Sequence, residues 1–233
     1  RLIRESKFML RLDVEVPTSA KLVLAQEERF KSYYNRLTHL IDEHERVVNE
    51  IAPVTAALLA PHVSGVEAAL KPGLTDLTWT STNIDLFLQR VHNKITSLEL
   101  TVGKINDMLH NRVDANLKEA SRVMLISLPE DESATCEEFV AMQNKTTKTE
   151  GHVLAVKSDE VRRSCDEIVT LIAEALPNNE WGSKLELDST AVKEFKGHYA
   201  RLTYSAVLHA TRRSFAVLKK RVGSRGGGGF LFL

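Results

Sequence analysis

The residues that could bind a metal ion or act as a nucleophile are few and widely spaced. A helical bundle that holds two iron ions carries Glu-x-x-His on two helices, and the nearest match is a single Asp107-x-x-His110. Cys136 and Cys165 lack a C-x-x-C partner, and the chain has no HExxH motif and no G-x-S-x-G nucleophile motif. The sequence therefore predicts no metal site and no catalytic residue, and we interpret both cysteines as ordinary helix residues.

The glycine run Gly226–Gly229 is the nearest candidate for a phosphate-binding loop. A Walker loop needs a Lys-Ser or Lys-Thr pair and a helix directly after its glycines, and neither follows this run. We therefore interpret the run as a linker. We expect no ATP, magnesium or other cofactor to bind to residues 1–233.

Two histidines and a basic cluster leave more than one interpretation open. His44 and His209 fall on apolar helical faces, which favours buried, hydrogen-bonded histidines, although a pH-sensing role is an alternative. The basic cluster comes near the end of the chain and consists of Arg212, Arg213, Lys219, Lys220, Arg221 and Arg225. These cations can offset a helix dipole on a solvated face, or they can contact an acidic partner.

The composition favours long helices and a chain that does not span a membrane. Hydrophobic residues make up 43% of the chain and charged residues 27%, with only 6% aromatics. Because 31 basic residues balance 31 acidic ones, nothing in the net charge favours nucleic acid. The longest uncharged run, Ile51–Val66, contains two prolines and is too short to span a bilayer. Two cysteines and no visible signal peptide predict a reduced, cytoplasmic protein.

The apolar spacing divides the chain into helices that must position every candidate residue. In the first, steps of three and four residues join Phe30, Tyr33, Leu37, Leu40, His44, Val47 and Ile51. In the second, the same steps run from Ile84 to Leu109 and then shift by one position through Val113 and Leu117. Such a shift lets a helix leave one partner and contact another. These patterns predict an all-α fold, an elongated bundle of long antiparallel amphipathic helices without a sheet.

Caps and turn residues give the expected boundaries. Thr135 and Glu138 have capping-box spacing, and Ser189 or Thr190 can cap the last helix. The expected segments are the end of a preceding helical segment (1–16), a first long helix plus a Pro-broken short helix (17–70), a linker (71–82), a second long helix (83–127), a third helix (134–176), a fourth helix (189–222) ending at Gly223, and a Gly-rich linker to the rest of a longer protein (223–233).

Inward faces are also expected for the last two helices. The third helix should bury Phe139, Met142, Val153, Val156, Ile168 and Ile172, and its polar middle, Asn144–His152, should be exposed. The fourth helix should bury Val192, Phe195, Tyr199, Leu202, Ala206 and His209. A helical stripe of this kind is usually intramolecular core, and the alternative is a surface for helices of another chain.

A short motif connects the first two long helices. It reads L-x-P-G-L-x-x-L-x-W-x-S-x-x-I and consists of Leu70, Pro72, Gly73, Leu74, Leu77, Trp79, Ser81 and Ile84. Pro72 lacks an N–H and Gly73 tolerates positive φ, so together they are expected to stop a helix and turn the chain. Ser81, Thr82 and Asn83 are suitable N-caps for a helix that begins at Ile84. Apolar residues in the linker indicate that the linker packs on something, with Trp79 as its anchor.

This motif resembles one in the N-terminal tail, or stem, of dynein heavy chains, most of all the axonemal, outer-arm-like ones. The resemblance extends from Pro17 and Ala20 through the first long helix, and Phe87 and Phe139 fall where that tail has its next helices. The apolar end at Phe232 is similar to the point where the tail passes to a following segment. The resemblance thus covers most of residues 17–222.

The resemblance implies a structural role within a large motor. Its parent would be an ATP-hydrolysing microtubule motor of the cilium or flagellum axoneme, with the ATP and magnesium site in another part of the polypeptide. This segment would be a non-enzymatic scaffold for tail assembly and docking. Its implied partners are other dynein heavy chains, intermediate and light chains, and docking proteins on doublet microtubules, without nucleic acid or membrane. Tubulin or another tail subunit would then be the acidic partner of the basic cluster.

Two other classes of protein share some of these features. A spectrin-like or tethering rod of an unrelated scaffold would show the same heptads, and it would not need the P-G-L-x-x-L-x-W-x-S linker. An enzyme built on a four-helix bundle would need polar residues grouped on the inward stripes. The stripes show only isolated histidines.

Overall fold

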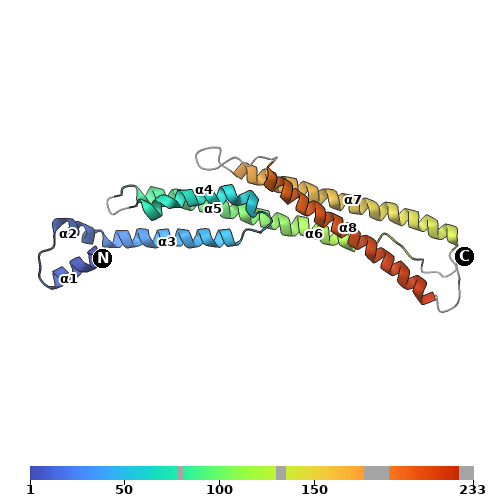
Figure 1. Ribbon diagram of the computed structural model, residues 1–233, viewed down its shortest axis with the longest axis horizontal. Coiled ribbons are helices and arrows are strands. Elements are labelled where there is room, and N and C mark those ends of the chain that lie inside the picture. Colours follow the sequence, from blue (N-terminus) through green and yellow to red (C-terminus); the bar gives the residue numbers. More distant parts are fainter. Residues whose placement is uncertain (78–80, 130–134, 176–188, 226–233) are drawn as a thin grey trace. The chain divides into compact units, whose positions relative to one another are not determined.

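The computed structural model describes residues 1–77, 81–129, 135–175 and 189–225 (Figure 1). All regular elements in these ranges are helical, which confirms the predicted all-α class. Trp79 and most of the expected Gly-rich linker (223–233), from residue 226 on, lie outside the described residues. In chain order the elements are α1 (Leu2–Arg11), α2 (Thr18–Ala25), α3 (Glu27–Asn49), α4 (Ala56–Thr75), α5 (Ile84–Met108), the π-helical η1 (Leu109–Asp114), α6 (Ala115–Arg122), α7 (Cys136–Ala175) and α8 (Thr190–Arg225).

The helices belong to two compact units. Among the described residues, the N-terminal unit holds chiefly residues 1–52 and 59–102, and the C-terminal unit holds chiefly residues 53–58, 103–174 and 189–225. Each unit has its own set of buried apolar side chains. None of the described helices combines the length and the apolar composition that crossing a bilayer requires.

The main body of the N-terminal unit consists of α3, α4 and α5, which Figure 1 draws side by side. Arg36 and Arg46 of α3 form ion pairs with Asp85 and Glu99 of α5. Since both partners advance along their helices together, α3 and α5 are parallel, and α4 is the return leg between them. The buried residues of these helices include Leu40, His44, Val47, Leu59, Val66, Leu70, Ile84, Leu88, Val91, Ile95, Leu98 and Val102.

Two boundaries in this unit differ from those expected. The first long helix is interrupted at Gln26, which separates α2 from α3. The expected short helix between Pro53 and Pro61 is part of α4, which contains both Pro61 and Pro72. A proline in a helix removes a hydrogen bond and costs about 3 kcal/mol, but the burial of Leu59, Val66 and Leu70 on the same helix offsets that cost. The return leg is therefore a full helix.

The C-terminal unit is built from η1, α6, α7 and α8. Arg112 pairs with Glu167 and Lys157 with Glu119, so η1 and α6 run antiparallel to α7. α8 in turn runs antiparallel to α7, and Lys196 of α8 pairs with Asp166 of α7. Ala120 of α6 packs with Leu154 of α7 and with Ala206 and Ala210 of α8.

The π-helical segment lies at the point where the apolar stripe of the second long helix shifts. Ile105, Leu109 and Val113 are separated by two steps of four, and all three are buried. A π-turn adds one residue to a helical turn, so it keeps all three on the inward face. The helix then ends at Arg122 rather than near residue 127.

The N-termini of α7 and α8 are capped at the expected residues. The Thr135 N–H donates to Glu138 Oε2 (2.9 Å) and the Glu138 N–H donates to Thr135 Oγ1 (3.2 Å), forming a capping box. At the start of α8, the Val192 N–H donates to Ser189 Oγ at 3.4 Å. The other end of α8 lies beyond Gly223, at Arg225, because a glycine does not by itself stop a helix.

Three inward assignments on these helices are wrong. Val156, Leu202 and His209 are exposed. The buried positions nearby are Leu154 on α7 and Ala206 and Ala210 on α8. A stripe extrapolated at fixed spacing drifts around a helix of 36 or 40 residues, which explains these errors. The polar middle of α7, Asn144–His152, is exposed or half-buried as expected.

Candidate functional site

The junction between α4 and α5 carries the motif that the sequence singles out. Leu70 and Ile84 are buried at the two sides of the junction, with 5% and 8% of their surface exposed. Leu77 and Ser81 are half-buried, whereas Leu74 is 64% exposed. The motif therefore contributes two core residues that belong to different helices and one apolar residue that faces solvent.

Pro72 and Gly73 do not form the expected turn. α4 continues through both residues to Thr75, and Gly73 has no positive φ. The helix ends two residues later, where the N–H groups of Asp76 and Leu77 both donate to the Pro72 carbonyl oxygen, at 3.0 and 3.2 Å. The helix α4 therefore ends at Thr75 and not at the Pro-Gly pair.

Gly73 is instead a point of close helix packing. A Cβ at this position would lie 2.9 Å from Phe87 Cζ and 3.1 Å from Leu37 Cδ1. Phe87 belongs to α5 and Leu37 to α3, so the absence of a side chain lets three helices approach at one place. From the sequence we expected Gly73 to allow a turn of the backbone. In the structure, its lack of a side chain instead leaves room for Phe87 and Leu37.

A positive φ occurs instead at Asn83, directly before α5. Asn83 has φ of 61°, a left-handed conformation that asparagine adopts more readily than most residues. Its carbonyl oxygen accepts a hydrogen bond from the Phe87 N–H at 3.1 Å. Asn83 thus redirects the chain into the first turn of α5.

A hydrogen-bonded chain of polar residues lies next to this turn. Arg36 Nη1 donates to Asp85 Oδ1 at 2.6 Å, and the Tyr33 hydroxyl donates to Asp85 Oδ2 at 2.7 Å. Arg29 Nε in turn donates to the Tyr33 oxygen at 2.7 Å. The hydrogen bond from Tyr33, and then that from Arg36, hold the pKa of Asp85 below its ordinary value. Asp85 also occupies the first turn of α5, where the helix dipole favours a negative charge.

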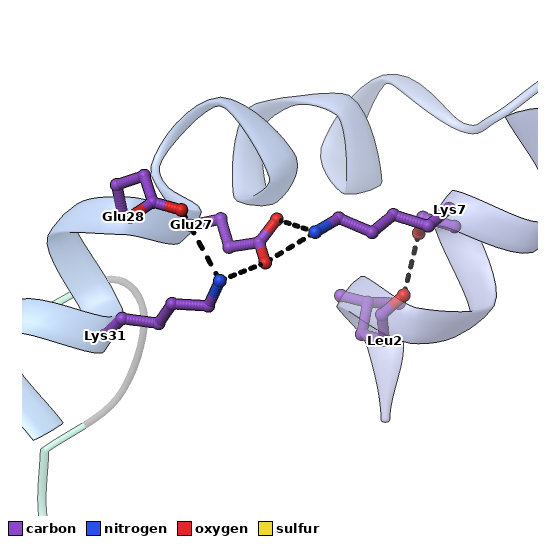
Figure 2. Close-up of polar contacts among 6 residues, drawn as sticks. Leu2, Lys7, Glu27, Glu28 and Lys31 are labelled. Carbon is purple, nitrogen blue, oxygen red and sulfur yellow. Dashed lines mark hydrogen bonds and ion pairs between the residues drawn. The ribbon is translucent and has the colours of Figure 1, made fainter.

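A second ionic cluster links α1 to α3 (Figure 2). Lys7 of α1 and Lys31 of α3 both approach the carboxylate of Glu27, at 2.6 and 2.8 Å. Glu27 is buried although it is charged. Hydrogen bonds from Lys31 first and Lys7 second lower the pKa of Glu27. The carboxylate therefore remains ionised and fixes α1 against the start of α3.

A further group of polar side chains in this unit consists of histidines from α3, α4 and α5. His39 and His92 face Glu43 from α3 and α5, with Nδ1 atoms 3.5 and 3.8 Å from its Oε2. His44 is buried as expected, but its Nε2 and both ring nitrogens of His62 lack hydrogen-bond partners among the described residues. Within the same part of the chain, no three His, Cys, Asp or Glu side chains are arranged to hold a metal ion.

The two cysteines differ sharply in environment. Cys136 is exposed at the start of α7, and Cys165 is buried in its second half. Burial, with a smaller effect from Asp166, raises the pKa of Cys165 to about 12. A thiol with that pKa is protonated at neutral pH and is a poor nucleophile. Cys165 therefore contributes to the packing of the C-terminal unit rather than to reactivity.

The polar clusters were not identifiable from spacing alone. Glu27, Asp85 and Glu99 are ordinary acidic residues in a sequence that contains 31 of them. The one available signal was position, because Glu27 and Asp85 each fall in the first turn of a helix. Their partners come from other helices, which only the fold identifies.

Comparison with known proteins supports the family resemblance that the motif indicates. Residues 1–87, which include all of it, match the family model "Dynein heavy chain, N-terminal region 1". Over all 233 residues the chain is 38% identical to the dynein gamma chain of the flagellar outer arm of Chlamydomonas reinhardtii. It is 34% identical to dynein axonemal heavy chain 5 of Mus musculus over 73% of its length, and 30% identical to dynein axonemal heavy chain 8 of Homo sapiens over 73%.

The matched region is a small part of each relative. The chain spans 5% of the length of the Chlamydomonas gamma chain and 4% of the mouse and human chains. The family model and the similarity over all 233 residues of this chain indicate the same family. The motif at the α4–α5 junction indicates that family as well. This chain therefore belongs to the dynein heavy chain family and corresponds to the N-terminal tail region of its axonemal members.

Proposed function

We propose that the chain is a structural scaffold in the tail of a ciliary or flagellar dynein heavy chain. The parent would be a microtubule motor that drives sliding in the axoneme. The observation that carries the proposal is the similarity of all 233 residues to a segment of an outer-arm heavy chain. It is joined by the presence of two helical units whose polar groups connect helices to one another. A spectrin-like rod of an unrelated scaffold would not account for that similarity.

We further propose that ATP is hydrolysed elsewhere in the parent polypeptide and that this segment needs no cofactor. The support is that the chain has no Walker motif. The segment would instead assemble with other heavy chains, with intermediate and light chains, and with docking proteins on the doublet microtubule. Extended helical units suit this task because they present long surfaces on rigid elements.

A pair of substitutions in the full-length heavy chain tests the scaffold role. Leu70→Asp places a charge in the core of the N-terminal unit, where Leu70 is 5% exposed. Ser64→Asp adds the same charge to the exposed face of the same helix. We expect Leu70→Asp to reduce incorporation of the heavy chain into axonemes severalfold, with unchanged ATP hydrolysis per soluble motor molecule, and Ser64→Asp to leave both unchanged.

The opposite pattern would contradict the proposal. If Leu70→Asp abolished ATP hydrolysis per motor molecule while axonemal incorporation stayed normal, this segment would belong to the catalytic machinery and not to the assembly of the tail. Quantitative immunoblotting of isolated axonemes measures incorporation, and phosphate release from the purified soluble chain measures hydrolysis.

A further inference from the structure

The outer face of α8 carries a second stripe of large side chains, opposite the face that packs in the C-terminal unit. The inward face of α8 is formed by Val192, Phe195, Tyr199, Ala206, Ala210 and Ser214. The second stripe consists of Arg201, Tyr204, Leu208, Arg212, Phe215 and Lys219. At 3.6 residues per turn these six residues fall within an arc of about 80°, centred opposite the inward face. We call this set the outer stripe.

The outer stripe exposes two aromatic rings. Tyr204 is 71% exposed and Phe215 is 61% exposed, and Leu208 between them is half-buried. Aromatic side chains gain the most from burial in an interface, and exposed ones aligned on a single helix mark an interaction surface more often than scattered ones do. Their steps of three and four residues repeat the spacing by which helices pack on each other.

The outer stripe is also positively charged and uncompensated. Residues 195–233 contain eight Lys and Arg residues and no Asp or Glu, although the whole chain is neutral. On the inward side, Lys196 pairs with Asp166 at 2.7 Å and Arg221 donates to the Pro129 carbonyl oxygen at 3.3 Å. Arg201, Arg212 and Lys219, in contrast, form no ion pair with any residue that the structure describes.

The spacing of the cations on the outer stripe favours an acidic helix over a nucleic acid as the partner. Arg201 and Arg212 lie about 16 Å apart along the helix, and Arg212 and Lys219 about 10 Å apart. A nucleic acid presents a phosphate at much shorter intervals, and the spaces between these cations are filled by apolar side chains. An α-helix that carries acidic and apolar residues at steps of three and four matches both features.

We propose that the outer stripe of α8 binds an acidic amphipathic helix of another protein chain. Apolar residues of the partner would pack on Tyr204, Leu208 and Phe215, and its carboxylates would pair with Arg201, Arg212 and Lys219. This inference goes beyond the scaffold role and does not depend on it, because it rests only on the exposure of the α8 side chains and on their charge.

Photocrosslinking in the native complex tests this inference. The full-length polypeptide carries benzoylphenylalanine in place of Phe215, and a matched protein carries it in place of Val156, an exposed residue of α7. After irradiation, mass spectrometry identifies the crosslinked peptide. We expect position 215 to crosslink to a different chain, at a peptide with net negative charge and apolar residues at steps of three and four, and position 156 not to crosslink to that peptide.

Charge-reversal variants distinguish a specific contact at the outer stripe from a general effect of charge. R212E with K219E should reduce the crosslink at position 215 about tenfold or more, because like charges would then face each other across the interface. K118E with K148E makes the same change at two exposed residues of α6 and α7 and should not affect the yield. Each of the following results would overturn the proposal: no crosslink, a crosslink confined to this chain, a neutral or basic partner peptide, nucleic acid or lipid as the adduct, or a yield insensitive to R212E with K219E.

Discussion

At the residue scale, the two glycines of α4 allow two effects on stability to be told apart, steric crowding and backbone entropy. Gly73 meets Phe87 and Leu37, whereas a Cβ on Gly65 would meet nothing within 4 Å. Both residues are helical, so alanine should improve the helix propensity at each. Only at Gly73 must neighbouring side chains move.

We therefore expect Gly65→Ala and Gly73→Ala to have opposite effects. Gly65→Ala should stabilise the N-terminal unit by about 0.5–1 kcal/mol. Gly73→Ala should give no gain and should destabilise by roughly 1 kcal/mol or more, because the rings and methyl groups around it are displaced. Chemical denaturation followed by circular dichroism measures both, and an equal stabilisation by the two variants would refute the packing role of Gly73.

The half-buried His62 should make the N-terminal unit sensitive to mild acid. Burial lowers the pKa of His62 below its ordinary value of 6.5. The unfolded chain therefore binds the proton more readily than the folded chain, so stability is highest above pH 6.5 and falls as the pH decreases through that value. His62→Leu should flatten this dependence between pH 7.5 and 5, as measured by thermal unfolding. His209→Leu, at an exposed position, should retain it, and equal slopes for wild type and His62→Leu would contradict the assignment.

At the element scale, the fold was predictable where apolar spacing is regular and where caps are local. The stripe residues Leu40, His44, Val47, Leu88 and Ile95 are buried as their spacing indicates, and Thr135 and Glu138 form the expected capping box. The return leg α4 was not predictable because its prolines indicate a break, and packing of Val66 and Leu70 outweighs them. Ion pairs between helices depend on the alignment of those helices, which local patterns do not contain.

The π-helical segment shows how a spacing irregularity becomes a structural element. One residue in η1 is extra relative to a continuous α-helix, since Leu109 and Val113 follow two steps of four. Removing an exposed residue there should convert η1 to α-helix while residues on both sides keep their inward faces.

Two single-residue deletions test this interpretation. Deletion of His110, exposed in η1, should change the unfolding free energy by less than about 1 kcal/mol. Deletion of Arg90, exposed in the regular part of α5, should cost roughly 3 kcal/mol or more, because Ile84 and Leu88 rotate away from the core. If the His110 deletion cost as much as the Arg90 deletion, η1 would not be the site of the extra residue.

At the scale of the whole molecule, each unit has its own core, and the two cysteines provide a probe of one of them. Both thiols belong to α7 in the C-terminal unit, one exposed and one buried. In the native protein, Cys136 should react with Ellman's reagent within minutes. Cys165 should react at least about a hundredfold more slowly, until denaturant opens the C-terminal unit, because it is both buried and protonated. Equal rates for the two thiols in native buffer would mean that α7 is not packed as described.

The central claim is that this chain is a scaffold segment of a much larger axonemal dynein heavy chain. The most direct measurement is an immunoblot of isolated cilia and of whole-cell extract with an antibody raised against residues 1–233. The account predicts a band many times heavier than 26.1 kDa, enriched in cilia and released together with dynein ATPase activity. A band near 26.1 kDa, absent from cilia, would contradict the account and would leave a free-standing helical protein.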